Sequence, residues 1–211
     1  DVACLRQEVP VPGAPAGPLP AARGRAAVSL PADRLEHRLP DSKPLLSAAE
    51  AVVEASRCLY CHDAPCIAAC PTGIDVPTFI RKIGTDNLRG AARVILSANV
   101  LGYSCARVCP VEVLCAGACV YNDWNRDPPI AIGRLQRYAT ETLLREGRAA
   151  AVLSRAPGNG RRVACVGAGP ASLTVARDLA PLGYSITVFD GEAKAGGFMR
   201  SQIPRFRLPE S

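Results

Sequence analysis

The feature that most constrains this chain is a concentration of cysteines. Ten cysteines occur among 211 residues, and eight of them lie between Cys58 and Cys119, whereas Cys4 and Cys165 stand alone. In a reducing compartment, thiols gathered in this way usually bind metal rather than form disulfides. Because the chain has only two histidines, the expected ligands are thiolates. The segment is therefore expected to fold around metal centres.

Composition narrows the class of protein. Hydrophobic residues make up 48% of the chain and charged residues 21%, which is ordinary globular usage and excludes a wholly disordered protein. No apolar run approaches the roughly 18 to 20 residues of a membrane span, and the start of the sequence does not resemble a signal peptide. A soluble, cytoplasmic protein is expected. The net charge is +6, but aromatic residues are only 5%, which disfavours a stacking surface for nucleic acid.

The sequence predicts successive regions of different character. Its first 44 residues are rich in Pro and Ala and lack helical or strand periodicity, as in an extended arm. Ser47 and Glu50 form a capping box that starts a helix running into Cys58. Further helices are expected at 76–83, 88–98 and 130–146, followed by a strand-turn-helix-strand unit. The expected divisions are the arm (1–44), an α-helical domain (45–146), a linker (147–161) and a partial nucleotide-binding unit (162–211).

The spacing of the clustered cysteines favours iron–sulfur chemistry. The first block is Cys58-x2-Cys61-x4-Cys66-x3-Cys70-Pro71, and the second is Cys105-x3-Cys109-Pro110-x5-Cys115-x3-Cys119. Cysteine followed by proline is typical of bacterial ferredoxins, in which the last cysteine of a block ligates the other cluster. Zinc modules usually separate their ligand pairs by a dozen or more residues, unlike the first block. Two iron–sulfur clusters are favoured, and zinc sites, disulfides or free thiols are the alternatives.

A glycine-rich turn predicts a dinucleotide site. The run Gly167-Ala168-Gly169-Pro170-Ala171-Ser172 follows an expected strand at 163–166 and opens a helix, and the next strand (185–189) leads to Asp190. The two glycines permit a tight turn and the close approach of a pyrophosphate, and an acidic residue at this spacing binds ribose hydroxyls. Ser172 stands where the usual fingerprint has its third glycine. A glycine turn without a ligand is the alternative, and the turn alone does not identify the dinucleotide.

These motifs together resemble one family. The stretch Cys58-Leu-Tyr-Cys-His-Asp-Ala-Pro-Cys66, with Cys70-Pro-Thr, Leu101-Gly102, Cys109-Pro110, Cys115, Cys119 and Ile130-Ala-Ile-Gly-Arg-Leu-Gln136, is similar to the N-terminal part of the dihydropyrimidine dehydrogenases. The similarity is greatest to the flavoprotein subunits of the bacterial NAD-dependent enzymes and extends over roughly residues 45–209. The small subunit of glutamate synthase shares the same layout. The resemblance implies a ferredoxin-like α-helical iron–sulfur domain followed by the start of a Rossmann-like FAD-binding domain.

The resemblance also implies which residues hold cofactors. It assigns one 4Fe-4S cluster to Cys58, Cys61, Cys66 and Gln136, and a second to Cys70, Cys109, Cys115 and Cys119. Cys105 corresponds to a family cysteine that is not a ligand. Gln136 would supply a neutral amide oxygen, which changes the charge and hence the potential of its cluster; its alternative role is an ordinary helix residue. FAD would contact residues 167–172, Asp190 and Gly197, and the NAD(P)H motif of the family would follow Ser211.

The expected activity follows from the same resemblance. Electrons would pass from NAD(P)H through FAD and two clusters to an FMN-containing partner subunit that interconverts uracil or thymine with the 5,6-dihydropyrimidine. No catalytic acid or base for that reaction is evident, and the 50 residues from Arg162 are too few to enclose FAD. The chain is thus expected to be a fragment or a subunit of a hetero-oligomer that does not complete the reaction alone. The alternatives are a glutamate synthase small subunit, a related ferredoxin-linked reductase, and a noncatalytic zinc-binding adaptor.

Overall fold

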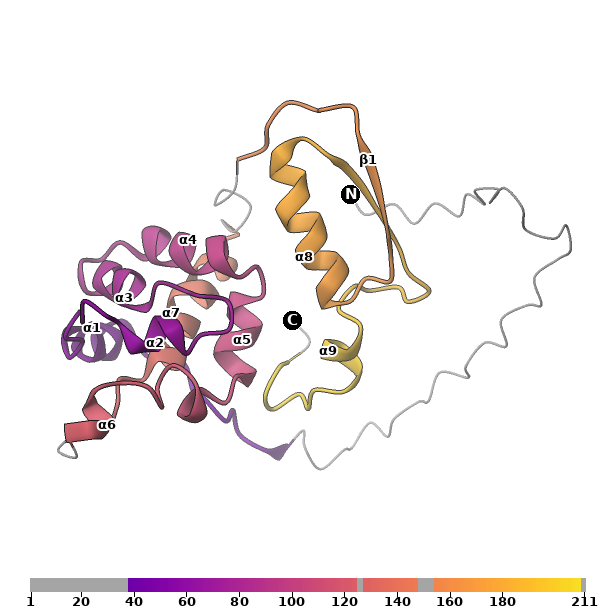
Figure 1. The fold of residues 1–211 in the computed structure, drawn as a ribbon. Coiled ribbons are helices and arrows are strands. Elements are labelled where there is room, and N and C mark those ends of the chain that lie inside the picture. Colours follow the sequence, from indigo (N-terminus) through magenta and orange to yellow (C-terminus); the bar gives the residue numbers. More distant parts are fainter. Residues whose placement is uncertain (1–37, 125–126, 148–153, 210–211) are drawn as a thin grey trace, which may run out of the picture.

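The computed structural model describes residues 38–124, 127–147 and 154–209. A body of helices lies beside a smaller unit that contains two strands and one long helix (Figure 1). Most of the predicted arm (1–37) and part of the predicted linker (148–153) lie outside the described residues. Among the described helices, none is long and apolar enough to cross a membrane.

The helical body begins where its capping box predicts. The Ser47 Oγ accepts a hydrogen bond from the Glu50 N–H at 3.3 Å, and the Ser47 N–H donates to the Glu50 carboxylate at 2.8 Å. Helices α3 and α4 start at similar caps, where Asp75 and Asn87 accept hydrogen bonds from backbone N–H groups. The helical elements are α1 (Ala48–Ser56), α2 (Pro65–Ala68), α3 (Val76–Gly84), α4 (Leu88–Ala98), α5 (Gly102–Val108), η2 (Val111–Val113), α6 (Tyr121–Trp124) and α7 (Ile132–Arg145).

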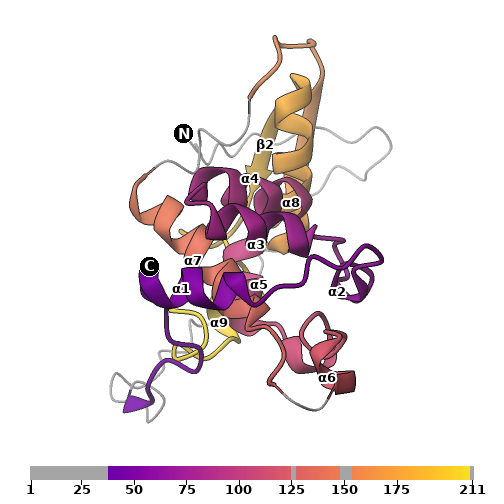
Figure 2. The same cartoon turned by 90° about the vertical axis from the view of Figure 1, so that its left-hand side faces the viewer.

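Most of the predicted helices are confirmed, but α5 was not predicted. Helix α5 packs closely against α7, and α7 also packs against α1, α3 and α4. The core at this centre includes Phe79, Ile80 and Leu135, each with none of its surface exposed. Figure 2 shows α2 and α6 on the same side of this bundle. Half-buried cysteines pack against the core, so the thiols belong to the folded body rather than to an appended loop.

The second unit is the predicted strand-turn-helix-strand. Its elements are β1 (Arg162–Val166), α8 (Pro170–Leu179), η4 (Ala180–Leu182), β2 (Ser185–Phe189) and α9 (Phe198–Ser201). The strands are parallel, with Arg162 opposite Ser185 and Val166 opposite Phe189. Parallel strands joined through a helix are the opening of a Rossmann-like fold. Helix α8 has no buried residue, and Val166 is 90% exposed, so this unit has little core of its own.

Candidate functional site

Four cysteines, the first thiol group, line one small cavity: Cys58, Cys61, Cys66 and Cys119. Helix α1 delivers Cys58, whose backbone N–H donates to the carbonyl of Ala55 at 3.2 Å. The following loop bends at Tyr60 and Ala64, whose φ angles are 53° and 23°. Such angles are costly for residues other than glycine and persist where the surrounding structure imposes them. The bend lets closely spaced thiols face a common space.

Burial controls the acidity of the first thiol group. It raises the pKa of Cys58, and neighbouring Cys61 and Cys119 raise it further because adjacent negative charges repel. Burial likewise raises the pKa of Cys66 to about 11, with Cys58 and Cys119 among its neighbours. Cys58 and Cys66 are therefore protonated at neutral pH without a metal. Metal binding must release their protons and bring positive charge among them.

The second thiol group comprises Cys70, Cys109 and Cys115, which are free and half-buried. Burial raises the pKa of Cys115, and the charge of Cys70 raises it too, so these side chains are close neighbours. Cys115 in turn contributes to the raised pKa of Cys109. Cys109 ends helix α5, where its N–H donates to the carbonyl of Cys105 at 2.9 Å.

The structure divides the predicted ligands differently from the sequence. Cys119 was expected beside Cys70 and Cys109, but it lines the cavity of the first thiol group. The physical reason lies two residues later, where the Tyr121 hydroxyl donates to the Arg57 carbonyl at 2.8 Å. That long-range hydrogen bond brings the segment after Cys119 next to Arg57, the residue before Cys58. The order of cysteines along the sequence contains no sign of this return.

Gln136 is also placed differently from the prediction. It does not line the cavity of the first thiol group among the described residues. Its side chain is 7% exposed, and its Nε2 donates to the carbonyl of Gly102 at 2.7 Å. Gly102 begins α5, the helix that leads to Cys109. The amide oxygen of Gln136 is not used in this bond, so it remains available as an oxygen ligand on the α5 side.

Cys105 lies against the second thiol group. Its hydrogen bond with Cys109 lowers the pKa of Cys105 to about 6, and Asn99 Nδ2 also donates to the Cys105 sulfur at 3.2 Å. The same contact raises the pKa of Cys109. A non-ligand role for Cys105 stays a prediction, but the thiol is a direct neighbour of an expected ligand.

The described side chains do not converge on a single metal ion. Within the described part of the chain, no three cysteine, histidine, aspartate or glutamate side chains form a group that would hold one metal ion. A structural zinc requires four ligands converging at about 2.0 to 2.3 Å. An iron–sulfur cube instead takes thiolates at separate corners. His62 is exposed beside Cys61 and is not needed in either thiol group.

A segment ahead of α1 reaches the second thiol group. Lys43 Nζ donates to the carbonyl of Cys109 at 2.6 Å. Asp41 accepts from Arg107 at 3.0 Å and from Arg137 at 2.6 Å, and both arginines are at most 5% exposed. Burial raises the pKa of Asp41, but the Lys43 N–H and these arginines outweigh it, so the net pKa is lowered. The sequence assigned residues 41–44 to an arm because nothing local signals these contacts.

The glycine turn has the geometry of a dinucleotide cradle. Gly167 has a φ of +86°, and a Cβ added to Gly169 would meet no atom within 4 Å, so the space before it is open. Gly197 has a φ of +50°, and a Cβ added to it would lie 3.1 Å from the Gly169 Cα, so position 197 has no room for a side chain. No side chain caps the start of α8. Its backbone N–H groups can therefore meet a phosphate.

Asp190 supports this turn. Its carboxylate accepts hydrogen bonds from the Glu192 N–H, at 2.7 Å, and from the Ala168 N–H. These bonds lower the pKa of Asp190, because they favour its charged form. The carboxylate thus follows β2 at the edge where a ribose would lie. Its bond with Ala168 connects the end of β2 to the turn that follows β1.

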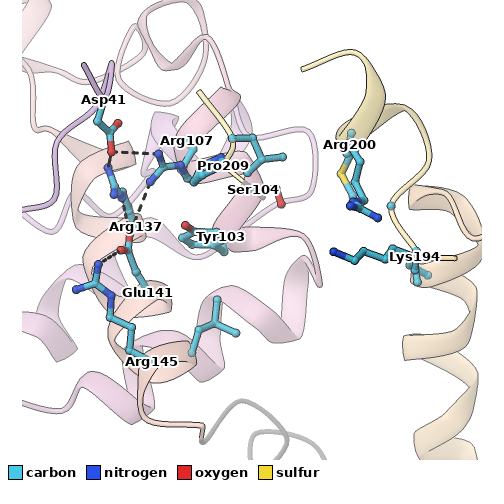
Figure 3. Close-up of a pocket in the computed structure, with 16 residues that line it drawn as sticks. Asp41, Tyr103, Ser104, Arg107, Arg137, Glu141, Arg145, Lys194, Arg200 and Pro209 are labelled. Carbon is cyan, nitrogen blue, oxygen red and sulfur yellow. Dashed lines mark hydrogen bonds and ion pairs between the residues drawn. The ribbon is translucent and has the colours of Figure 1, made fainter. Parts of the chain in front are cut away.

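A cleft of about 1030 Å³ separates the helical body from the nucleotide unit. In Figure 3, Arg107, Arg137 and Glu141 form one wall, and Lys194 and Arg200 project from the other. Its size and basic walls fit an elongated anionic molecule such as a dinucleotide. Two hydrogen bonds join the halves beside it: Arg107 Nε donates to the Arg207 carbonyl at 2.8 Å, and Arg207 donates to the Val108 carbonyl at 3.2 Å. The buried Arg207 Nε has no described partner and remains available as a donor.

Comparison with known proteins gives two family matches. Residues 36–148 match a family model described as dihydropyrimidine dehydrogenase domain II, 4Fe-4S cluster. Residues 165–208 match an NAD(P)-binding Rossmann-like domain. The first match spans both thiol groups, and the second spans the glycine turn.

Curated relatives match most of the chain. The NAD-dependent dihydropyrimidine dehydrogenase subunit PreT of Escherichia coli K12 is 44% identical over 178 residues, which are 83% of this chain and 42% of the relative. The PreT homolog of Salmonella typhi is 45% identical over 179 residues, 84% of this chain and 41% of the relative. The chain thus spans about two fifths of the length of these relatives.

Proposed function

Since this chain belongs to the family of dihydropyrimidine dehydrogenase domain II proteins, which carry 4Fe-4S clusters, we propose that it is the electron-transfer portion of an NAD(P)H-linked iron–sulfur flavoprotein. The observation that carries this proposal is the placement of two half-buried thiol groups in one helical body, next to a nucleotide-type turn. Such a body holds redox centres at fixed positions, as electron transfer requires.

The proposed domains follow the predicted divisions. Residues 45–146 form a ferredoxin-like α-helical domain, 147–161 form a linker, and 162–211 open an FAD-binding domain after the arm at 1–44. The described contacts support one addition, because residues 41–44 pack on α5 and α7 and act with the helical domain. We also propose a cytoplasmic location, since clustered cysteines that bind metal are typical of reducing compartments.

Two sets of four ligands are proposed, one for each cluster. The first set is Cys58, Cys61, Cys66 and Cys119, and the second is Cys70, Cys109, Cys115 and Gln136. The shared cavity of the first thiol group supports the first set. The second set rests on the effect of the Cys70 charge on Cys115 and of the Cys115 charge on Cys109, and on the position of Gln136 against α5. Bound clusters would supply one-electron steps.

FAD is the proposed dinucleotide. The run from Gly167 to Ser172 would meet the pyrophosphate, Asp190 the ribose, and Gly197 would leave room for the backbone of the turn to approach. The described cleft reaches from Leu173 of α8 and the loop before α9 to α5, and the glycine turn itself does not line it. Lys194 and Arg200 would balance the negative charge of FAD, while Arg107 lines the wall on α5, the helix that leads to Cys109. A flavin there would convert hydride transfer into single-electron transfer.

The complete reaction would require further protein. The named relatives are subunits of NAD-dependent dihydropyrimidine dehydrogenases. By this analogy, electrons from NAD(P)H would leave the clusters for an FMN-containing partner subunit, which would interconvert uracil or thymine with the 5,6-dihydropyrimidine. This chain would act as an electron carrier within a hetero-oligomer, and no residue of it is proposed as a catalytic acid or base.

Metal analysis of anaerobically purified protein tests the proposal. About eight irons and eight labile sulfides per chain are expected for two clusters. Stoichiometric zinc without sulfide would refute it and favour an adaptor. NADH oxidation by the complete complex should respond to uracil; a response to glutamine with 2-oxoglutarate instead would indicate a glutamate synthase.

Single substitutions test the ligand sets in the same preparation. Cys66→Ala and Cys119→Ala should abolish the same electron paramagnetic resonance signal, because both residues line one cavity. Gln136→Ala should perturb the other signal, and Cys105→Ser should leave both. Loss of different signals from Cys66→Ala and Cys119→Ala would restore the division that the sequence predicts.

A further inference from the structure

We infer that Lys43 is a positioning residue that raises the reduction potential of the cluster held by the second thiol group. This inference rests on the proposed function. It concerns a residue that lies outside the cysteine blocks and the glycine turn, in a segment that the sequence assigns to an arm. Two observations carry it: where the ammonium group lies, and what fixes it there.

The Lys43 ammonium is held at the end of α5. Its Nζ donates to the carbonyl oxygen of Cys109 at 2.6 Å, and the side chain is only partly exposed. Cys109 is the residue that ends α5. A lysine at a helix C-terminus satisfies a carbonyl that has no partner within the helix. Here the same residue also supplies a thiol of the second group, so the ammonium lies beside an expected cluster ligand.

The backbone of Lys43 is fixed by buried arginines. Its N–H donates to Asp41 at 3.0 Å, and the Asp41 carboxylate is held by Arg107 and Arg137. Arg137 also donates to the Lys43 carbonyl, and Arg134 donates to the next carbonyl, that of Pro44, at 3.1 Å. These arginines come from α5 and α7, the helices at the centre of the body. These hydrogen bonds fix the backbone of Lys43 on the helical body and orient its side chain toward Cys109.

The Lys43 ammonium lies near two members of the second thiol group, Cys109 and Cys115, so that its charge reaches both side chains. Arg207 lies close enough to repel Lys43, whereas Glu112 attracts it, so the ammonium belongs to a mixed group of charges at this end of α5. Lys43 is not among the groups that shift the pKa of Cys58 or Cys66 in the first thiol group.

Electrostatics gives the direction of the effect. One-electron reduction adds one negative charge beside the Cys109 and Cys115 sulfurs, and an adjacent fixed cation stabilises that charge. Removing the cation should therefore make the second cluster harder to reduce. The second thiol group also lies next to Val108, whose carbonyl accepts from Arg207 of the nucleotide unit. A raised potential at this position would draw electrons from a donor bound in the cleft.

Redox titration of the full chain, purified anaerobically with its clusters and followed by electron paramagnetic resonance, tests the inference. Lys43→Gln should lower the reduction potential of one cluster by about 59 mV, which corresponds to a tenfold change in its one-electron reduction equilibrium. Lys43→Arg should restore it, because Arg keeps the charge. Lys82→Gln removes the same charge from α3 and should shift neither cluster. A Cys70→Ala variant identifies the signal of the second cluster.

The outcomes separate this inference from the proposed function. Absence of iron and sulfide from the unmodified chain would overturn both. Two normal clusters with an unchanged potential in Lys43→Gln would overturn only the role of Lys43. Equal shifts of both clusters, or a shift that Lys43→Arg fails to restore, would also overturn it. Loss of the second cluster from Lys43→Gln would show a purely structural role instead.

Discussion

The helical body and the nucleotide unit reach their conformations in different ways. In the body, Phe79, Ile80 and Leu135 are completely buried, and α7 packs against four other helices. In the nucleotide unit, α8 buries no residue, while Val166 is 90% and Phe198 77% exposed. Its shape depends instead on glycines with positive φ and on the contacts of Asp190. A packed core fixes redox centres, whereas an open turn leaves backbone groups accessible to a ligand.

This contrast predicts that truncating a core side chain has a large effect only in the helical body. Leu135→Ala should lower the free energy of unfolding by about 2 to 5 kcal/mol, because it leaves a cavity at the centre of the bundle. Val166→Ser should change it by less than about 0.5 kcal/mol, since that side chain is already in water. Hydrogen exchange of α7 and β1 measures both effects. Equal destabilisation would show that the exposed face of β1 is covered in solution.

The buried arginines give a second, pH-dependent difference between the halves. Asp41→Asn should destabilise the helical body by about 1 to 3 kcal/mol at pH 7, because Arg107 and Arg137 lose their shared carboxylate. Folding lowers the pKa of Asp41 below its ordinary 3.8, so its contribution is complete above that value and disappears as the pH falls through the folded pKa. The Asp41→Asn and unmodified proteins should therefore approach the same free energy of unfolding in acid.

Urea unfolding of both proteins between pH 7 and pH 3 measures this convergence. Arg145→Gln is the matched control, since Arg145 pairs with Glu141 in the same network but its side chain is 68% exposed. That substitution should cost no more than about 1 kcal/mol. A constant difference between the Asp41→Asn and unmodified proteins at every pH would show that packing, rather than the carboxylate charge, holds residues 41–44.

Local signals predicted the parts of the fold that depend on neighbouring residues. The Ser47 capping box, the strand at 185–189 and the turn at Gly167 are each specified within a few residues, and the structure contains all three. The Rossmann-like match also agrees with that turn. The unpredicted helix α5 lies between cysteine-bearing segments, and its stability comes from packing on α7 rather than from a clear cap.

Long-range contacts account for what the sequence did not reveal. Cys119 joins Cys58 because Tyr121 bonds to the Arg57 carbonyl, 64 positions away. Lys43 reaches the Cys109 carbonyl across 66 positions. Neither contact leaves a periodic pattern or a spacing rule in the chain. Cysteine spacing therefore indicated the kind of cofactor and its candidate ligands, while their distribution between two groups required the folded arrangement.

The smallest expected change in stability tests the open turn of the nucleotide unit. Gly169→Ala should alter the free energy of unfolding by less than about 0.5 kcal/mol, because its backbone is extended and a Cβ there meets no atom within 4 Å. It should nevertheless weaken FAD binding, since the added methyl group occupies the space that a pyrophosphate needs. Gly197→Ala is the contrasting variant, because a Cβ there lies 3.1 Å from the Gly169 Cα and φ is +50°. Flavin fluorescence titration of the complete complex measures FAD affinity, and thermal unfolding measures stability. Unchanged FAD affinity in Gly169→Ala would place the dinucleotide elsewhere, whereas loss of affinity with unchanged stability would locate it at this turn.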